Sequence, residues 1–153
     1  MDLIKRRWIG CKKCVYCDAE ESVEHLFIKC PFARDIWRLL HFTFNVSPPT
    51  SIANLFGTWL NGIDKITKAR IRIGVAAILW ALWNCRNDIV FNQMHSSHYL
   101  QIIHKACYWI HSWSLLLPAD QRGLMEAGCT RMLTVVRTIF TSFGWFQPIR
   151  IDV

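Results

Sequence analysis

The fold of this chain is decided near its beginning, where residues 14–37 read CVYCDAEESVEHLFIKCPFARDIW. Three cysteines and one histidine in this stretch follow the pattern C-x2-C-x7-H-x4-C, formed by Cys14, Cys17, His25 and Cys30. Two cysteines separated by two residues can both turn their sulfurs inward across a tight turn, and a later His and Cys complete a tetrahedron suited to Zn. The pattern therefore predicts that a zinc ion organises a segment with little other means of holding its shape.

Four protein ligands leave no open position for water or substrate, so we expect a structural zinc and not a catalytic one. On an ideal α-helix His25 and Cys30 would point about 140° apart, because each residue advances about 100°. The chain must therefore break or distort between them. Pro31 follows Cys30 directly, and a proline there allows a helix to break at little energetic cost. The neighbouring Lys12 and Lys13 favour the ionised thiols that metal binding requires.

Alternatives remain for these cysteines. The spacing could arise by chance among seven cysteines that are all ordinary reduced thiols. Cys11 and Cys14 also form an overlapping C-x2-C pair, so Cys11 could replace one ligand. The shorter loop to His25 favours Cys14 with Cys17.

The fold class expected is mainly α, with a small CCHC zinc module followed by about four helices. Ser22 is an N-cap candidate for a short helix through Leu26 and Phe27, and Pro31 suits the first position of a second helix. Apolar residues recur at spacings of three and four, with almost no strict alternation. Paired prolines after Ser47 place a boundary between a module at 8–45 and a helical region at 46–153. The helices expected in that region span 52–60, 67–93, 99–117 and 122–143.

The composition is that of a core-forming chain of 153 residues, 52% hydrophobic and 19% charged. The net charge of +7 includes a basic beginning, with five Lys or Arg residues against Asp2 before residue 14. The odd number of cysteines and the charges where a secretory signal needs an apolar run indicate a reducing, intracellular compartment. The longest apolar run is far shorter than the about 20 residues that span a bilayer, so we expect no membrane segment.

No catalytic set of residues is recognisable. Two-metal nucleotidyl transfer needs clustered carboxylates, and the only adjacent acids are Glu20 and Glu21. There is no phosphate-cradling Gly-rich loop, no H-E-x-x-H and no G-x-S-x-G, and the zinc deaminase signature fails because Glu24 precedes His25. We therefore expect no enzyme and no small-molecule substrate.

The basic beginning favours a nucleic-acid partner, RNA or single-stranded DNA. Cationic side chains would contact phosphates, while Trp8, Tyr16 and Phe27 near the zinc site would stack on bases. Solvated charges and an apolar cap on the metal site explain the same residues equally well. The candidate nucleic-acid residues are Lys5, Arg6, Arg7, Trp8, Lys12 and Lys13.

Two further groups of residues have a spacing that could serve a function. Trp80, Trp83, Asn87 and Phe91 recur at three and four along the long predicted helix, which favours a buried stripe over a stacking platform. Arg86, beside Asn87, has no partner that the sequence identifies.

His104, Cys107 and His111 fall at i, i+3 and i+7 of another predicted helix and could in principle bind a second metal. They alternate with Ile103, Trp109 and Ile110, which favours ordinary half-buried residues.

These motifs resemble those of a known family. Arg6-Arg7-Trp8, Cys14-x2-Cys17, Glu24-His25-Leu26-Phe27-x2-Cys30-Pro31-Phe32-Ala33 and Ile36-Trp37 resemble the reverse transcriptase zinc-binding domain at the C-terminal end of plant LINE-type (non-LTR) retrotransposon polyproteins. Trp80-x2-Trp83-x2-Arg86-Asn87-Asp88-x2-Phe91-Asn92 resembles the segment that follows that domain. The resemblance implies Cys14, Cys17, His25 and Cys30 as zinc ligands, favours Cys14 over Cys11, and suggests a nuclear address. It also implies a detached C-terminal fragment that carries the second half of the family domain.

The function expected is a non-enzymatic, zinc-binding and nucleic-acid-binding accessory segment derived from such an element. One rival is a helical protein-interaction module in which zinc is purely structural. The other is a retroelement remnant without a function of its own. Aromatic side chains exposed on a detached segment would also permit self-association.

Overall fold

The computed structural model describes residues 12–94 and 98–143, and this part of the chain is mainly helical, with one short hairpin and connecting loops and turns. The order is a π-helical turn η2 (His25–Lys29), then α1 (Pro31–Phe44), α2 (Ile52–Phe56), α3 (Lys65–Asn92), α4 (Tyr99–Ser114) and α5 (Ala119–Phe143). The mainly α fold and the expectation of about four helices after residue 46 are confirmed.

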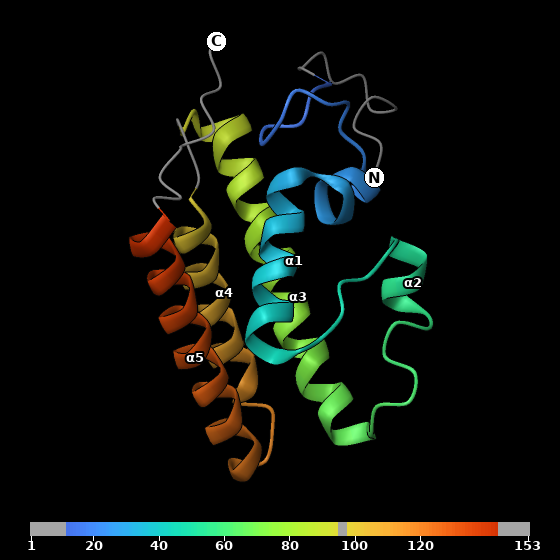
Figure 1. Cartoon of the computed structure of the whole chain (residues 1–153), viewed down its shortest axis with the longest axis vertical. Coiled ribbons are helices and arrows are strands. Elements are labelled where there is room, and N and C mark those ends of the chain that lie inside the picture. Colours follow the sequence, from blue (N-terminus) through green and yellow to red (C-terminus); the bar gives the residue numbers. More distant parts are fainter. Residues whose placement is uncertain (1–11, 95–97, 144–153) are drawn as a thin grey trace.

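Three long helices form the body of the molecule (Figure 1). α4 packs against α3 on one side and against α5 on the other, and α1 packs against α5 and η2. The hairpin and η2 lie at the end of the bundle where α3 finishes, whereas α2 lies to the right at about mid-height in that view (Figure 1). The cysteine-rich segment therefore covers one end of a helical bundle.

Local sequence signals explain where the helices begin. Pro31 occupies the first turn of α1, and Ser51 caps α2 by accepting a hydrogen bond from the backbone N–H of Asn54 at 3.0 Å. Asp64 accepts from the N–H groups of Ile66 and Thr67, so α3 starts two residues before the predicted 67. A proline in the first turn therefore marks the start of α1, and a side-chain hydrogen-bond acceptor just before the helix marks the start of α2 and of α3.

Three further helix limits differ from those predicted from the sequence. α2 ends at Phe56 and not at 60, because Gly57 follows and residues 57–62 form turns. α4 ends at Ser114 and not at 117, because the chain tightens into turns in which the N–H of Leu117 donates to Ser114. α5 starts at Ala119 and not at 122, since Pro118 accepts from its first turn. Periodicity alone could not find these limits.

One connected core joins the helices to the cysteine-rich segment. It includes Tyr16 and Leu26 from that segment, Ile36 from α1, Leu82 from α3 and Ile103 from α4. Buried contacts therefore cross the boundary expected between 8–45 and 46–153, and that division into two domains stays a prediction.

None of the helices in the described ranges combines the length and the hydropathy that spanning a bilayer requires.

The buried stripe expected along α3 is wrong for two of its four residues. Trp80 is 43% exposed and Phe91 is 57% exposed, while Trp83 and Asn87 are half-buried. The side of α3 that faces the core carries Ala77, Ile78, Ala81, Leu82 and Cys85.

A buried ion pair fixes the hairpin on α3. Arg86 is 2% exposed, and its Nε and Nη2 donate to the carboxylate of Glu21, the closest contact being 2.6 Å. Trp83 and Phe91 face the guanidinium with ring centres at 5.5 and 6.0 Å. Removing one partner of a buried pair leaves an uncompensated charge in the interior.

We predict that Glu21→Gln lowers the free energy of unfolding by about 3–5 kcal/mol, because Arg86 would remain buried without its counter-charge. Urea unfolding followed by circular dichroism measures this. Glu20→Gln is the matched control, since Glu20 is the exposed neighbour on the same hairpin and should change stability by less than about 0.5 kcal/mol. Equal effects of the two substitutions would contradict the role given to the pair.

Candidate metal centre

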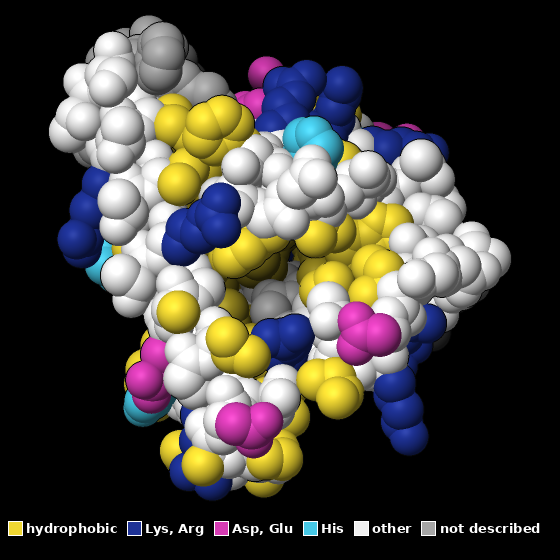
Figure 2. Space-filling view, turned by 60° about the horizontal axis from the view of Figure 1, so that its bottom comes forward, with side chains coloured by type: hydrophobic (Ala, Val, Ile, Leu, Met, Phe, Trp, Pro, Cys, Tyr) yellow, Lys and Arg dark blue, Asp and Glu magenta, His cyan; other side chains and the backbone are white. Residues whose placement is uncertain are grey.

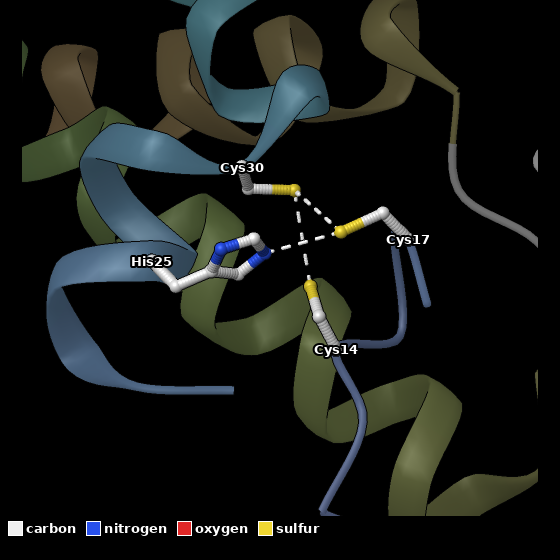
Figure 3. Close-up of side chains that lie close together, drawn as sticks. All are labelled: Cys14, Cys17, His25 and Cys30. Atoms are coloured by element: carbon white, nitrogen blue, oxygen red, sulfur yellow. Dashed lines mark hydrogen bonds between the residues drawn. The ribbon is translucent and has the colours of Figure 1, made fainter. Parts of the chain in front are cut away.

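The four residues singled out by the sequence pattern converge on one point (Figure 3). Cys14 and Cys17 come from the hairpin, His25 begins η2, and Cys30 stands between η2 and α1. Their three sulfurs and one imidazole nitrogen all lie within 4.8 Å of one another. This cluster, called the Cys3His cluster below, could hold a metal ion.

The hairpin presents its two cysteines through backbone pairing. Lys13 and Glu20 form an antiparallel bridge, and the N–H of Cys14 donates to the carbonyl of Ala19 at 2.8 Å. Cys14 is buried, whereas Cys17 at the turn is only half-buried. The turn between them therefore brings both sulfurs to one side, as the C-x2-C spacing predicts.

The distortion expected between His25 and Cys30 is a π-turn. The N–H of Cys30 donates to the carbonyl of His25 at 2.7 Å, an i→i+5 bond that wraps five residues into about one turn. Ser22 supports this turn by accepting from the N–H of His25 at 3.0 Å, as its prediction as an N-cap implies. Cys30 then turns to extended backbone with ψ of 133° before Pro31. The chain both distorts and breaks, so the imidazole and the thiol share one side.

The separations between ligand atoms test whether a metal fits. The Sγ of Cys30 lies 3.8 Å from that of Cys14 and 3.9 Å from that of Cys17. A tetrahedral ion with bonds of about 2.3 Å to sulfur would separate two sulfurs by about 3.8 Å. A disulfide would instead place them about 2.05 Å apart. The Nε2 of His25 lies 3.1 Å from the Sγ of Cys17, somewhat closer than a tetrahedral edge.

The thiols differ in their proton affinity. A hydrogen bond with Cys30 lowers the pKa of Cys14 to about 5, while the same bond and burial raise the pKa of Cys30. Burial also raises the pKa of Cys17. The protein thus stabilises one thiolate within a compact group of three sulfurs, and a cation at their centre would favour ionisation of the others.

Only two of the six candidate nucleic-acid residues fall in the part of the chain that the structure describes. Lys12 and Lys13 are exposed on the hairpin, next to the Cys3His cluster in sequence. Lys5, Arg6, Arg7 and Trp8 lie outside the described residues, as does Cys11, the alternative ligand.

The expectation that Tyr16 stacks on nucleic-acid bases is wrong, because its ring is buried. Tyr16 is 3% exposed, its hydroxyl donates to the carbonyl of Leu82 at 2.9 Å, and its ring stacks on Phe32 at 4.5 Å. Phe32 in turn stacks on Tyr99. Phe27 is half-buried, and its carbonyl accepts from the indole N–H of Trp37 at 2.8 Å. Tyr16 therefore anchors the hairpin to α3.

The second candidate group, His104, Cys107 and His111, does not converge. Cys107 is half-buried and faces Cys129 of α5, while both histidines are exposed. Among residues 12–94 and 98–143 the Cys3His cluster is the sole grouping of three or more potential ligands.

Sequence reasoning missed the residues that hold the cluster in place. Glu21 pairs with Arg86, and Glu24 accepts from the N–H of Ile52 at the start of α2 at 3.0 Å. A charged residue between Trp83 and Phe91 was the available signal for Arg86, but nothing local identifies a partner 65 residues away.

Comparisons with known proteins bear on the same segment. Residues 1–37 match a family model described as zinc-binding in reverse transcriptase. The match includes all four residues of the Cys3His cluster and does not extend to residues 80–92, the second segment that resembles this family. No curated protein and no solved structure matches the chain in the corresponding comparisons.

We predict that the metal-free protein binds one equivalent of Co²⁺, with sulfur-to-metal charge-transfer absorption, because three thiols are available to a single ion. Cys17→Ser should weaken binding at least about 100-fold, since substitutions merely next to metal ligands already cost about 10–100-fold. Titration followed by visible absorption measures both.

Cys107→Ser provides the control for this titration and should leave affinity and stoichiometry unchanged. A second equivalent bound with similar affinity, or unaltered binding by Cys17→Ser, would contradict the assignment of the cluster.

Proposed function

We propose that the Cys3His cluster binds one structural zinc ion. The sulfur separations of 3.8 and 3.9 Å support this, as does a donor set of three thiols and one imidazole. Zinc bound there supplies a cross-link between the hairpin, η2 and the start of α1. Because all four positions come from the protein, no site remains for a reacting molecule.

We further propose that the chain is a non-enzymatic accessory segment that binds single-stranded RNA or DNA, derived from a LINE-type retrotransposon of a plant. The single observation that carries this is the match of residues 1–37 to the model described as zinc-binding in reverse transcriptase. The basic residues of the same segment, including the exposed Lys12 and Lys13, supply the phosphate-binding charge.

Acidic residues near the cluster compete with that charge, and two of them are neutralised. Glu21 is held by Arg86 at 2.6 Å, and Glu24 lies 3.8 Å from the Nζ of Lys29. Asp18 and Glu20 remain exposed on the hairpin. The cationic contribution to binding must therefore come mainly from the residues before Cys14, which carry five Lys or Arg against Asp2.

We predict that replacing these five basic residues by Gln reduces both the affinity for single-stranded RNA and its salt dependence. The slope of log affinity against log salt should fall in magnitude by about 3 to 4, at about 0.7 for each lost phosphate contact. Fluorescence anisotropy with a labelled oligonucleotide between 50 and 200 mM salt gives the slope. The residues replaced are Lys5, Arg6, Arg7, Lys12 and Lys13.

A variant with the same net charge separates a local site from general attraction. It replaces five basic residues of α3 and α5, which should leave the slope near that of the parent protein. Equal slopes for all three proteins would reject the nucleic-acid role while leaving the zinc site untouched. The residues replaced in this control are Lys65, Lys68, Arg72, Arg131 and Arg137.

An exposed aromatic patch supports the second candidate, a helical interaction module. Trp80 of α3 is 43% exposed and Tyr108 of α4 is 65% exposed, and both rings meet Trp109 edge to face. Trp113 extends the group with its ring centre 5.5 Å from that of Trp109. Large exposed aromatic groups of this kind mark association surfaces more often than isolated apolar residues do.

We predict that the isolated protein self-associates at high concentration through this patch, and that Trp80→Gln with Tyr108→Gln shifts it toward the monomer. Sedimentation equilibrium over a 100-fold range of concentration measures the change. Phe42→Gln, which replaces an exposed ring of α1, is the control. A monomer at every concentration, or an equal shift with Phe42→Gln, would contradict self-association through the patch.

A further inference from the structure

A cavity of about 330 Å³ opens between the helices, away from the Cys3His cluster (Figure 2). It is bounded by the last half of α1, the first half of α3 and the first half of α5, whereas the hairpin contacts α3 further along at Leu82 and Arg86. The volume falls in the range of about 300–1,000 Å³ that is usual for small-molecule sites. The described part of the chain therefore contains a site-sized space that the zinc hypothesis does not use.

The walls of the cavity are almost entirely apolar. They include the rings of Trp37, Phe44 and Trp59 together with Ile71, Val75 and Met132. Figure 2 shows hydrophobic side chains lining the hollow and a basic side chain at its edge. No Asp or Glu contributes to the lining among the residues described. Such a surface favours an alkyl or aryl group over a polar molecule.

Arg70 is the one charged residue of the lining. Its Nε is buried and has no hydrogen-bond partner, while an Nη donates to the hydroxyl of Thr67 at 3.1 Å. No carboxylate of the described residues lies within ion-pair distance of Arg70. Asp64 has a lowered pKa, mainly through the backbone N–H of Thr67 and only in small part through Arg70. One buried guanidinium nitrogen thus lacks a hydrogen-bond partner at a residue that lines an otherwise apolar cavity.

Two glycines keep the space open. A Cβ built on Gly74 of α3 would meet no heavy atom within 4 Å, and one on Gly128 of α5 would meet only the ring of Phe44 at 3.7 Å. Both glycines line the cavity. Glycine is a poor residue inside a helix, so its presence at two positions that line the cavity preserves volume at the expense of helix propensity.

We propose that this cavity binds a small molecule with one alkyl chain and one carboxylate, of the size of a medium-chain fatty acid. The chain would lie among the apolar walls, and the carboxylate would accept hydrogen bonds from the guanidinium of Arg70, which matches a carboxylate in shape and charge. None of the residues that line this cavity belongs to the Cys3His cluster or to the candidate nucleic-acid residues.

Isothermal titration calorimetry of the full zinc-loaded chain with octanoate, decanoate and dodecanoate below their micelle concentrations tests the proposal. Each added CH₂ should tighten binding about fourfold, which corresponds to about 0.8 kcal/mol. Arg70→Gln should weaken decanoate binding at least tenfold. Arg72→Gln, which removes an exposed charge from the same helix, should leave binding unchanged. Absence of saturable heat with the parent protein, or equal affinities of the two variants, would overturn the proposal.

A second variant keeps the test decisive if Arg70→Gln does not fold. Gly74→Leu fills the cavity from α3 and should abolish decanoate binding while raising the melting temperature of the free protein. Gly123→Leu makes the same change at an exposed position of α5 that also has no neighbour within 4 Å, and should preserve binding. Retained binding by a folded Gly74→Leu protein would show that the ligand lies elsewhere.

Discussion

A buried guanidinium determines how the hairpin is joined to helix α3. Arg86 is only 2% exposed, and a cation in that position is tolerated because the carboxylate of Glu21 in the hairpin supplies a counter-charge, with its nearest oxygen at 2.6 Å. Tyr16 reaches the carbonyl of Leu82, about one helical turn earlier on α3. These two contacts fix the hairpin in orientation as well as position, because they lie at separate points along one rigid helix. Because Cys14 and Cys17 belong to the hairpin, these contacts also orient the Cys3His cluster relative to α3.

The cluster adds what these contacts cannot provide, which is a constraint within the hairpin itself. The hairpin has a single isolated bridge, between Lys13 and Glu20, and Asp18 and Ala19 of its turn are exposed. Burial of Tyr16 alone cannot fix the turn at Cys17. Convergence of Cys17 with His25 and Cys30 connects that turn to η2 and α1, so binding of the proposed metal ion would be coupled to docking of the hairpin on α3.

Local signals predicted the elements, and long-range contacts account for what they missed. Pro31 and the ligand spacing were sufficient to place α1 and to require a distortion after His25. Trp80 and Phe91 were misplaced because this part of α3 carries apolar residues around much of its circumference, so a period of 3.6 does not identify the buried side. The pairing of Glu21 with Arg86 and the cavity beside Arg70 depend on elements far apart in sequence, for which no local pattern exists.

Closure of the proposed metal site restricts where function can reside. With three thiols and one imidazole around the ion, no coordination position is left for a substrate, so any activity must belong to surfaces that the fold presents. The described chain presents three: the exposed lysines of the hairpin, the aromatic patch around Trp109 and the cavity beside Arg70. All three depend on α3, which carries the hairpin near Arg86, Trp80 at its middle and Arg70 near its start. Zinc would thus act on function indirectly, because loss of the hairpin would expose the charged Arg86 at one end of the helix that the other sites share.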